Sequence, residues 1–497
     1  MYKKIVAQTT LYGVSNTLSK LSGLILLPLY TNLLPLQEYG LLGLFETLSI
    51  FIIAISGMGL RTALPRWYWL PEKTEQQKDL FFTVVSASIL FAVLISVMSY
   101  FVSTAFSGLI FQTQVNDRVI GFFMLSLFFR ILNELPFLIL RINQKAMAQT
   151  VIQAINLGLT VLLTYYFLAI ARMGIEGIFI SQMISAVITS IITVPTIRKY
   201  MSFVFLPTDF KAMMRFGLPL ALSSVLSILL SLSDRFILGY FINLEEVGTF
   251  SLASKVANVL QLIVITSFFS AYTHIFYQGM NKGADTRLFT KVPTWFWLSI
   301  VLCALGLTLF GKEIIVLTIY SNPEYWNSID VLPLLVTGLL LGGLRQIFVL
   351  DLSYHHQTKA ITVSVLASGI INVILNLILI PYWKSNGAAL ATAVTQFLVS
   401  VFLYLKIRKI SLVTYELRKM VVIFVIAAAI SWFAPYLNHW PLIVRLSAKM
   451  GMMAVFLGSL WVIGFFDAKE MEILKGFWTK WKDPTKLVSN IKQYKQH

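Results

Sequence analysis

Long apolar stretches alternate with short polar connections along most of the 497-residue chain. Each stretch is near or above the ~20 residues that a helix needs to cross the hydrocarbon core of a bilayer. The stretches lie at about 9–34, 39–60, 80–110, 119–140, 148–171, 174–197, 213–241, 247–277, 292–310, 329–350, 360–382, 387–405, 416–436 and 441–466. This pattern predicts an all-α polytopic membrane protein with about 14 transmembrane helices.

Composition supports a membrane protein over a soluble one. Hydrophobic residues make up 57% of the chain and charged residues only 12%, against about 25% charged in ordinary soluble domains. The formal net charge of +17 comes from basic residues that fall mostly between apolar stretches, so we expect no nucleic-acid binding. The single cysteine, Cys303, excludes an intrachain disulfide framework and a thiolate metal cluster.

The distribution of lysine and arginine predicts the orientation in the membrane. Connections on one side, together with the N-terminus and the tail, hold 28 of these residues, and the connections on the other side hold 4. Because basic residues collect on the cytoplasmic side, we expect both termini in the cytoplasm. The tail, 467–497, interleaves lysines with aromatic residues, which favours either an amphipathic segment on the anionic inner leaflet or a partly disordered basic tail.

The chain repeats itself at about 210 residues. Leu36–Gly40 (LQEYG) is echoed by Leu244–Gly248 (LEEVG), and Arg130 by Arg345. Six stretches per copy is an even number, so both copies insert in the same orientation. We therefore predict two six-helix bundles related by an internal repeat plus two extra C-terminal helices, with the boundaries 1–200, 201–410, 411–466 and 467–497.

The charged residues inside the apolar stretches are the candidate functional residues, because placing one charge near the centre of a membrane helix costs roughly 2.5–3.5 kcal/mol. Arg130 and Glu134 are four residues apart and would share a helix face. By depth, Lys20 is a possible partner of Glu46, and Asp234 of Lys255. The full set has five cations and three carboxylates, an excess that suits an anionic ligand: Lys20, Glu46, Arg130, Glu134, Asp234, Arg235, Lys255 and Arg345.

Several runs resemble a known family. They are GLILLPLYTNLLPLQEYG from Gly23, RFGLPL from Arg215, DRFILGYF from Asp234 and NVILNLILIPYWKSNGAALATA from Asn372. Together they resemble the O-antigen, capsule and exopolysaccharide flippases of the multidrug/oligosaccharidyl-lipid/polysaccharide (MOP) exporter superfamily. The resemblance implies two bundles around a central cavity, alternating access and a bacterial inner-membrane location. The two extra helices are similar to those that hold a polyprenyl tail in the peptidoglycan-precursor branch.

On this basis we expect a flippase, not an enzyme, that moves an undecaprenyl-diphosphate-linked sugar repeat unit to the outer leaflet. It would work as a monomer in the lipid bilayer, alongside polysaccharide-assembly proteins, and without a cofactor or metal other than a coupling H⁺ or Na⁺. The predicted substrate-binding residues are Lys20, Arg130, Arg235, Lys255 and Arg345, and the ion-coupling candidates are Glu46, Glu134 and Asp234.

Two rival functions remain open. A multidrug or metabolite exporter of the same superfamily would favour an acidic cavity and usually twelve helices. A membrane-embedded glycosyltransferase or ligase would need a substantial extramembrane loop with catalytic carboxylates, and no connection here is long enough to make that attractive.

Overall fold

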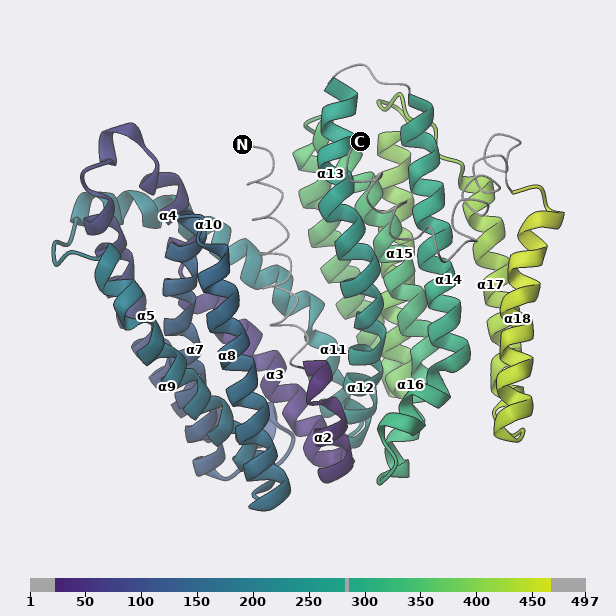
Figure 1. The fold of residues 1–497 in the computed structure, drawn as a ribbon, viewed down its shortest axis with the longest axis horizontal. Helices are drawn as coiled ribbons and strands as arrows, with labels where there is room; N and C mark the ends of the chain where they lie inside the picture. The colour runs from purple at the N-terminus through teal and green to yellow at the C-terminus, as the bar shows by residue number, and fades with distance from the viewer. Residues whose placement is uncertain (1–22, 282–285, 466–497) are drawn as a thin grey trace, which may run out of the picture. The chain divides into compact units, whose positions relative to one another are not determined.

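A computed structural model describes residues 23–281 and 286–465, so predictions for Lys20 and for the basic tail lie outside the described residues. Every regular element in the described ranges is helical (Figure 1). The elements are α2 (Leu27–Leu33), α3 (Leu36–Ser56), α4 (Leu60–Tyr68), η1 (Pro71–Lys73), α5 (Gln77–Ala105), α6 (Ser107–Ile110), α7 (Asp117–Ile142), α8 (Ala146–Thr164), η2 (Tyr165–Ile170), α9 (Gly174–Tyr200), α10 (Pro207–Ser231), α11 (Ser233–Phe241), α12 (Leu244–Leu260), η3 (Gln261–Ile265), α13 (Thr266–Asn281), α14 (Thr286–Thr318), η4 (Pro323–Asn327), α15 (Ser328–Tyr354), α16 (Thr358–Ile407), α17 (Leu417–Leu437) and α18 (Leu442–Val462).

The all-α membrane architecture predicted from the apolar pattern is confirmed. Within the described ranges, 12 helices are long and apolar enough to cross a membrane, and a shorter apolar helix covers Gly23–Leu33. One of the 12, α16, is interrupted at Lys384, whose backbone is not helical (φ 49°, ψ −131°). This break separates the predicted stretches 360–382 and 387–405, so each of the fourteen predicted stretches contains helix.

The stretch predicted as one span at 213–241 is two helices instead. Helix α10 ends at Ser231 and α11 begins at Ser233. The Asp234 carboxylate accepts the backbone N–H of Arg235 at 2.8 Å, and Ser233 Oγ donates to the carbonyl of Leu230 at 3.1 Å. Because the first N–H groups and the last C=O groups of a helix lack intrahelical partners, these polar side chains stabilise the break. Asp234 and Arg235 therefore open a helix instead of lying within one.

The two copies of the repeated motif meet each other. Helices α3 and α12 lie side by side (Figure 1). Gly40 of α3 faces Gly248 of α12. A Cβ atom on Gly40 would lie 1.8 Å from the carbonyl oxygen of Leu244, and one on Gly248 would lie 2.6 Å from that of Leu36. The contact is reciprocal because equivalent residues of the repeat face each other, and only glycine permits backbones to approach so closely.

The described chain forms two compact units. The larger falls within Met1–His274 and Gly311–Ser411, and the smaller falls within Ile275–Phe310 and Leu412–His497. In the larger unit, α4, α5, α7 and α10 share a buried core that includes Phe81, Ile139 and Met213.

The smaller unit has a polar anchor of its own. Glu416, just before α17, accepts hydrogen bonds from Lys291 Nζ and Thr294 Oγ1 of α14, each at 2.9 Å. Trp297 Nε1 donates to the carbonyl of Met420 at 2.8 Å. These bonds fix the start of α17 against α14. The division of the chain at residues 200, 410 and 466 stays a prediction.

Candidate functional site

A cavity of about 690 Å³ lies within the larger unit and is lined by α2, α3, α7, α8, α9, α12 and η3. Its size falls within the roughly 300–1,000 Å³ of pockets that enclose a small-molecule head group. Four charged side chains line it: Glu46, Arg130, Glu134 and Lys255. Two of the predicted cations and two of the predicted carboxylates therefore reach one cavity.

Lys255 and Glu46 form an ion pair on the wall of this cavity. Lys255 Nζ of α12 lies 2.8 Å from Glu46 Oε1 of α3, and 5.2 Å from the centre of the Tyr39 ring. The prediction that Lys255 pairs with Asp234 is therefore wrong. Depth along a helix does not determine which neighbour a side chain faces, and the crossing of α3 over α12 brings Glu46 to Lys255 instead.

Glu134 forms an ion pair with Arg61 and not with Arg130, its possible neighbour on the same helix face. Arg61 Nη1 of α4 lies 3.9 Å from Glu134 Oε2, and Arg61 also donates to Ser56 Oγ at 3.1 Å and to the carbonyl of Ile53. Arg61 is one of the 28 basic residues counted for the cytoplasmic side, because it follows the apolar stretch 39–60. A left-handed glycine, Gly59 (φ 78°), lets the chain turn directly into α4 and carry Arg61 back towards α7.

Arg130 is the cation of the cavity that no carboxylate neutralises directly. Its side chain is exposed, and it makes no hydrogen bond or ion pair with any described residue. Glu46 and Glu134 are close enough to interact with it electrostatically, but each is already engaged by another cation. Arg130 therefore presents a guanidinium with unused donors to the cavity.

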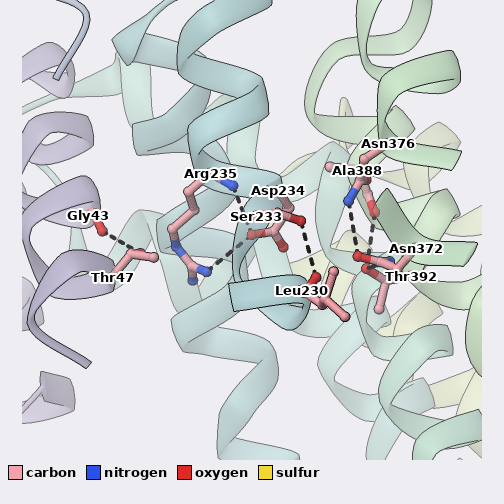
Figure 2. A network of polar contacts seen from close by, with 10 residues as sticks. All are labelled: Gly43, Thr47, Leu230, Ser233, Asp234, Arg235, Asn372, Asn376, Ala388 and Thr392. Carbon is pink, nitrogen blue, oxygen red and sulfur yellow. Dashed lines mark hydrogen bonds and ion pairs between the residues drawn. The ribbon is translucent and has the colours of Figure 1, made fainter. Parts of the chain in front are cut away.

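Arg235 and Asp234 lie elsewhere, at the start of α11. Arg235 Nη1 lies 3.6 Å from Asp234 Oδ1, and its guanidinium lies over Phe250 at 5.6 Å. Figure 2 shows Asp234 between Arg235 and polar side chains of α16. There Asn376 Nδ2 donates to Asn372 Oδ1 at 3.0 Å, and Asn376 Oδ1 is buried without a hydrogen-bond partner among the described residues. Neither Asp234 nor Arg235 lines the cavity.

Arg345 of α15 does not line the cavity either. Its Nε atom is buried without a hydrogen-bond partner, and it forms no ion pair with any residue in the described ranges. With Lys20 outside the described residues, the structure brings together Arg130 and Lys255 from the predicted substrate-binding set. Glu46 and Glu134 join them from the predicted coupling set.

Besides apolar side chains, the rest of the lining includes uncharged polar residues on α8 and α9, which the charge pattern of the sequence did not predict. Gln153, Asn156 and Thr160 follow one face of α8 at spacings of three and four residues, and Gln182, Ser185 and Thr189 follow one face of α9 in the same way. Polar residues at helical spacing within an apolar stretch were the available signal. Among the residues that the structure covers, no group of three or more His, Cys, Asp or Glu side chains is placed to hold a metal ion.

The cavity has one positively charged side, at Arg130 of α7, and one uncharged side, at α8 and α9. The Glu46–Lys255 and Glu134–Arg61 pairs largely cancel, which leaves the charge of Arg130 beside them. An arginine fork with free donors binds phosphate or carboxylate oxygens in pairs. The arrangement can therefore hold an anionic group at α7 next to an uncharged polar group at α8 and α9.

Comparison with known proteins gives one family match. A sequence model of the family described as "Polysaccharide biosynthesis protein" matches residues 5–275, which include every residue that lines the cavity. No curated protein matches the chain.

Solved structures share the fold at low sequence identity. The structure titled lipid II flippase MurJ, in an inward closed conformation, is similar with a TM-score of 0.73 and 14% identity, over 91% of this chain and 99% of that one. An inward-facing multidrug resistance MATE family transporter of the MOP superfamily has a TM-score of 0.63 and 16% identity, over 81% and 94%. A Vibrio cholerae MATE transporter has a TM-score of 0.56 and 17% identity, over 82% and 96%.

Proposed function

Because this chain belongs to the polysaccharide biosynthesis protein family, we propose that it is a flippase for an undecaprenyl-diphosphate-linked oligosaccharide. It is a multi-pass membrane transporter of the MOP type and not an enzyme. In the proposed cycle, the sugar head group enters the cavity from the cytoplasmic leaflet and leaves at the outer leaflet, while the lipid tail stays in the bilayer.

The observation that carries the proposal is the unpaired guanidinium of Arg130 in a cavity of head-group size. A diphosphate offers several anionic oxygens, and arginine binds two of them at once through its planar fork. Lys255 lines the same cavity and adds a second positive charge, partly offset by Glu46. A lipid diphosphate bound here would place its sugars inside the cavity.

The two repeats would provide alternating access. Residues 1–200 and 201–410 form the proposed moving halves, and the reciprocal contact of α3 with α12 at Gly40 and Gly248 is a suitable pivot between them. Helices α17 and α18 would guide the polyprenyl tail, as the resemblance implies. Both termini would face the cytoplasm of a bacterial cell, with the membrane being the inner one.

The candidate coupling carboxylates lie in two places. Glu46 and Glu134 line the cavity that would hold the substrate, whereas Asp234 lies outside the cavity on α11, which packs against α16 (Figure 2). A carboxylate away from the substrate can bind H⁺ or Na⁺ without competing with the diphosphate for space. We therefore favour Asp234 as the coupling residue.

The test is transport by the purified protein in proteoliposomes, combined with complementation of a strain that lacks its polysaccharide flippase. We expect the protein to move a polyprenyl-diphosphate-linked oligosaccharide between leaflets and to restore surface polysaccharide. The multidrug alternative predicts efflux of cationic drugs instead. Drug transport without movement of the lipid-linked sugar would contradict the proposal.

A further inference from the structure

One wall of the cavity, called the neutral wall below, carries uncharged polar residues that are not needed to bind the diphosphate. Its six polar residues come from two helices: Gln153, Asn156 and Thr160 of α8, and Gln182, Ser185 and Thr189 of α9. No residue that lines the cavity from α8 or α9 carries a charge. The charged residues come from α3, α7 and α12, so the two kinds of chemistry lie on different helices.

Part of this wall is organised by its own hydrogen bonds. Thr189 Oγ1 donates to Asn156 Oδ1 at 3.0 Å, and the hydroxyls of Thr160 and Ser185 lie 2.8 Å apart. Asn133 of α7 is fixed in the same way, because its Nδ2 donates to the carbonyl of Ala186 at 2.9 Å. These bonds hold α8 and α9 together and orient the polar groups before any ligand binds, which is the preorganisation that a binding site needs.

Other groups on the wall have unused hydrogen-bonding capacity. The side-chain amide of Gln182 makes no hydrogen bond with any described residue, and the same is true of the Nδ2 group of Asn156. An amide offers two donors and an acceptor with two lone pairs. Within apolar helices such groups are costly unless a ligand or water satisfies them. The wall therefore presents both donors and acceptors to the cavity.

We propose that α8 and α9 form a subsite for a neutral sugar, an uncharged hexose or N-acetylhexosamine, at the reducing end of the lipid-linked cargo. This inference rests on the proposed function, because Arg130 would hold the diphosphate to which that sugar is attached. Sugar hydroxyl and acetamido groups both donate and accept hydrogen bonds, which matches the amides of Gln182 and Asn156. The apolar side chains between them, such as Leu157, suit the C–H face of a sugar ring.

The same wall selects against acidic sugars. A uronic acid at this position would bring a carboxylate against helices that contribute no cation to the cavity. An unpaired charge in such a place carries a large desolvation cost. Discrimination would therefore come both from hydrogen bonds to the right sugar and from the absence of a counter-charge for the wrong one.

Binding of three defined ligands to the purified protein tests the subsite. They are a polyprenyl diphosphate without sugar, the same lipid bearing one N-acetylglucosamine, and the same lipid bearing one glucuronic acid. We expect the wild type to bind the N-acetylglucosamine lipid about fivefold or more tightly than the sugar-free lipid, since each hydrogen bond contributes a factor of this order. Tighter binding of the glucuronic acid lipid than of the N-acetylglucosamine lipid would overturn the proposal.

Substitutions of Gln182 test whether this residue binds the sugar. Gln182→Leu should reduce binding of the N-acetylglucosamine lipid to the level of the sugar-free lipid, and should leave binding of the sugar-free lipid unchanged. Gln396→Leu is the matched control, because Gln396 lies in α16 and does not line the cavity. Should Gln182→Leu not fold, Gln182→Asn keeps an amide, moves it by one methylene, and should weaken sugar binding in part. Wild-type affinity in a folded Gln182 variant would contradict the subsite.

The outcomes for the subsite and for the flippase differ. If Arg130→Gln leaves binding of both lipids unchanged while Gln182→Leu weakens only the sugar-bearing one, the diphosphate site at Arg130 is contradicted and the sugar subsite is supported. If Arg130→Gln weakens both lipids and Gln182→Leu weakens neither, the flippase proposal is supported and the subsite is contradicted.

Discussion

Lys255 of α12 and Glu46 of α3 are 209 residues apart in the chain and form an ion pair of 2.8 Å on the cavity wall. The pair connects the two repeats next to the place where a substrate would bind. Because the side chain of Glu46 is 42% exposed to the cavity, the attraction is weaker than that of a fully buried pair.

We predict that the pair stabilises the contact between the repeats. Lys255→Met alone leaves Glu46 without its partner, and Glu46→Gln alone leaves Lys255 unpaired, so each should lower the thermal stability of the purified protein. The double variant should recover part of the loss, with a coupling of about 1 kcal/mol. A double-mutant cycle on the unfolding temperature in detergent measures this coupling, and simple additivity of the two losses would contradict it.

The reciprocal glycine contact predicts a strong effect of a single methyl group. In Gly40→Ala the new Cβ would lie 1.8 Å from the carbonyl oxygen of Leu244, so α3 and α12 must separate. We expect a loss of at least about 2 kcal/mol and a lower protein level in the membrane. Gly158→Ala on α8 is the matched control, since no atom lies within 4 Å of its Cβ position. Equal behaviour of the two variants would exclude close packing at Gly40.

Glu416 predicts a pH dependence in the smaller unit. Burial alone would raise the pKa of its carboxyl, but hydrogen bonds from Lys291 and Thr294 and the charge of Lys419 hold the pKa below its ordinary value of 4.5. A carboxylate with a lowered pKa in the folded state stabilises the fold fully above its unfolded pKa, and the stabilisation is lost as the pH falls through the folded pKa.

Glu416→Gln should therefore lower the thermal stability at pH 7, by about 1–2 kcal/mol for the lost charge-assisted bonds. The difference between variant and wild type should shrink as the pH falls below about 4.5. Thermal unfolding of both proteins from pH 7 to pH 3.5 checks this. A difference that stays constant over that range would show that the charge of Glu416 does not stabilise the unit.

The proposed orientation predicts which connections a membrane-impermeant thiol reagent reaches. Helix α5, one of the candidate membrane spans, separates Glu75 from Gln114, so we expect the two positions on opposite sides of the membrane. In a Cys303→Ala background, Gln114→Cys and Lys384→Cys should be labelled in intact cells, and Glu75→Cys only after the membrane is opened. Labelling of Glu75→Cys in intact cells would show that the orientation is opposite to the one proposed.

The sequence predicted the helices well and the partners of the charges poorly, for a physical reason. Apolar length determines where a chain crosses a membrane, and this signal is local. The partner of Lys255 depends on how α12 crosses α3, which in turn depends on the closeness that Gly40 and Gly248 allow. The repeated motif was visible in the sequence, but its meaning as a contact between the two copies required the structure.

Arg61 and the neutral wall show the same limit. Arg61 was counted with the connections and not with the charges inside the apolar stretches, and the turn at Gly59 brings it to Glu134. We predicted no role for the amides of α8 and α9 from the sequence, because uncharged polar residues within a membrane helix are a weaker signal of function than charged ones. Arg130 lines the cavity and forms no ion pair with Glu134, and its role in binding stays a prediction.

In the proposed function, Arg130 binds the diphosphate of the transported lipid. The most direct measurement is the rate of lipid-linked oligosaccharide movement per folded protein in proteoliposomes, for Arg130→Gln, Arg130→Lys and the control Arg118→Gln, which removes an exposed arginine at the start of the same helix. We predict at least a roughly tenfold loss for Arg130→Gln, a smaller loss for Arg130→Lys because a point charge replaces the fork, and no loss for Arg118→Gln. Full transport by a folded Arg130→Gln variant would contradict the account.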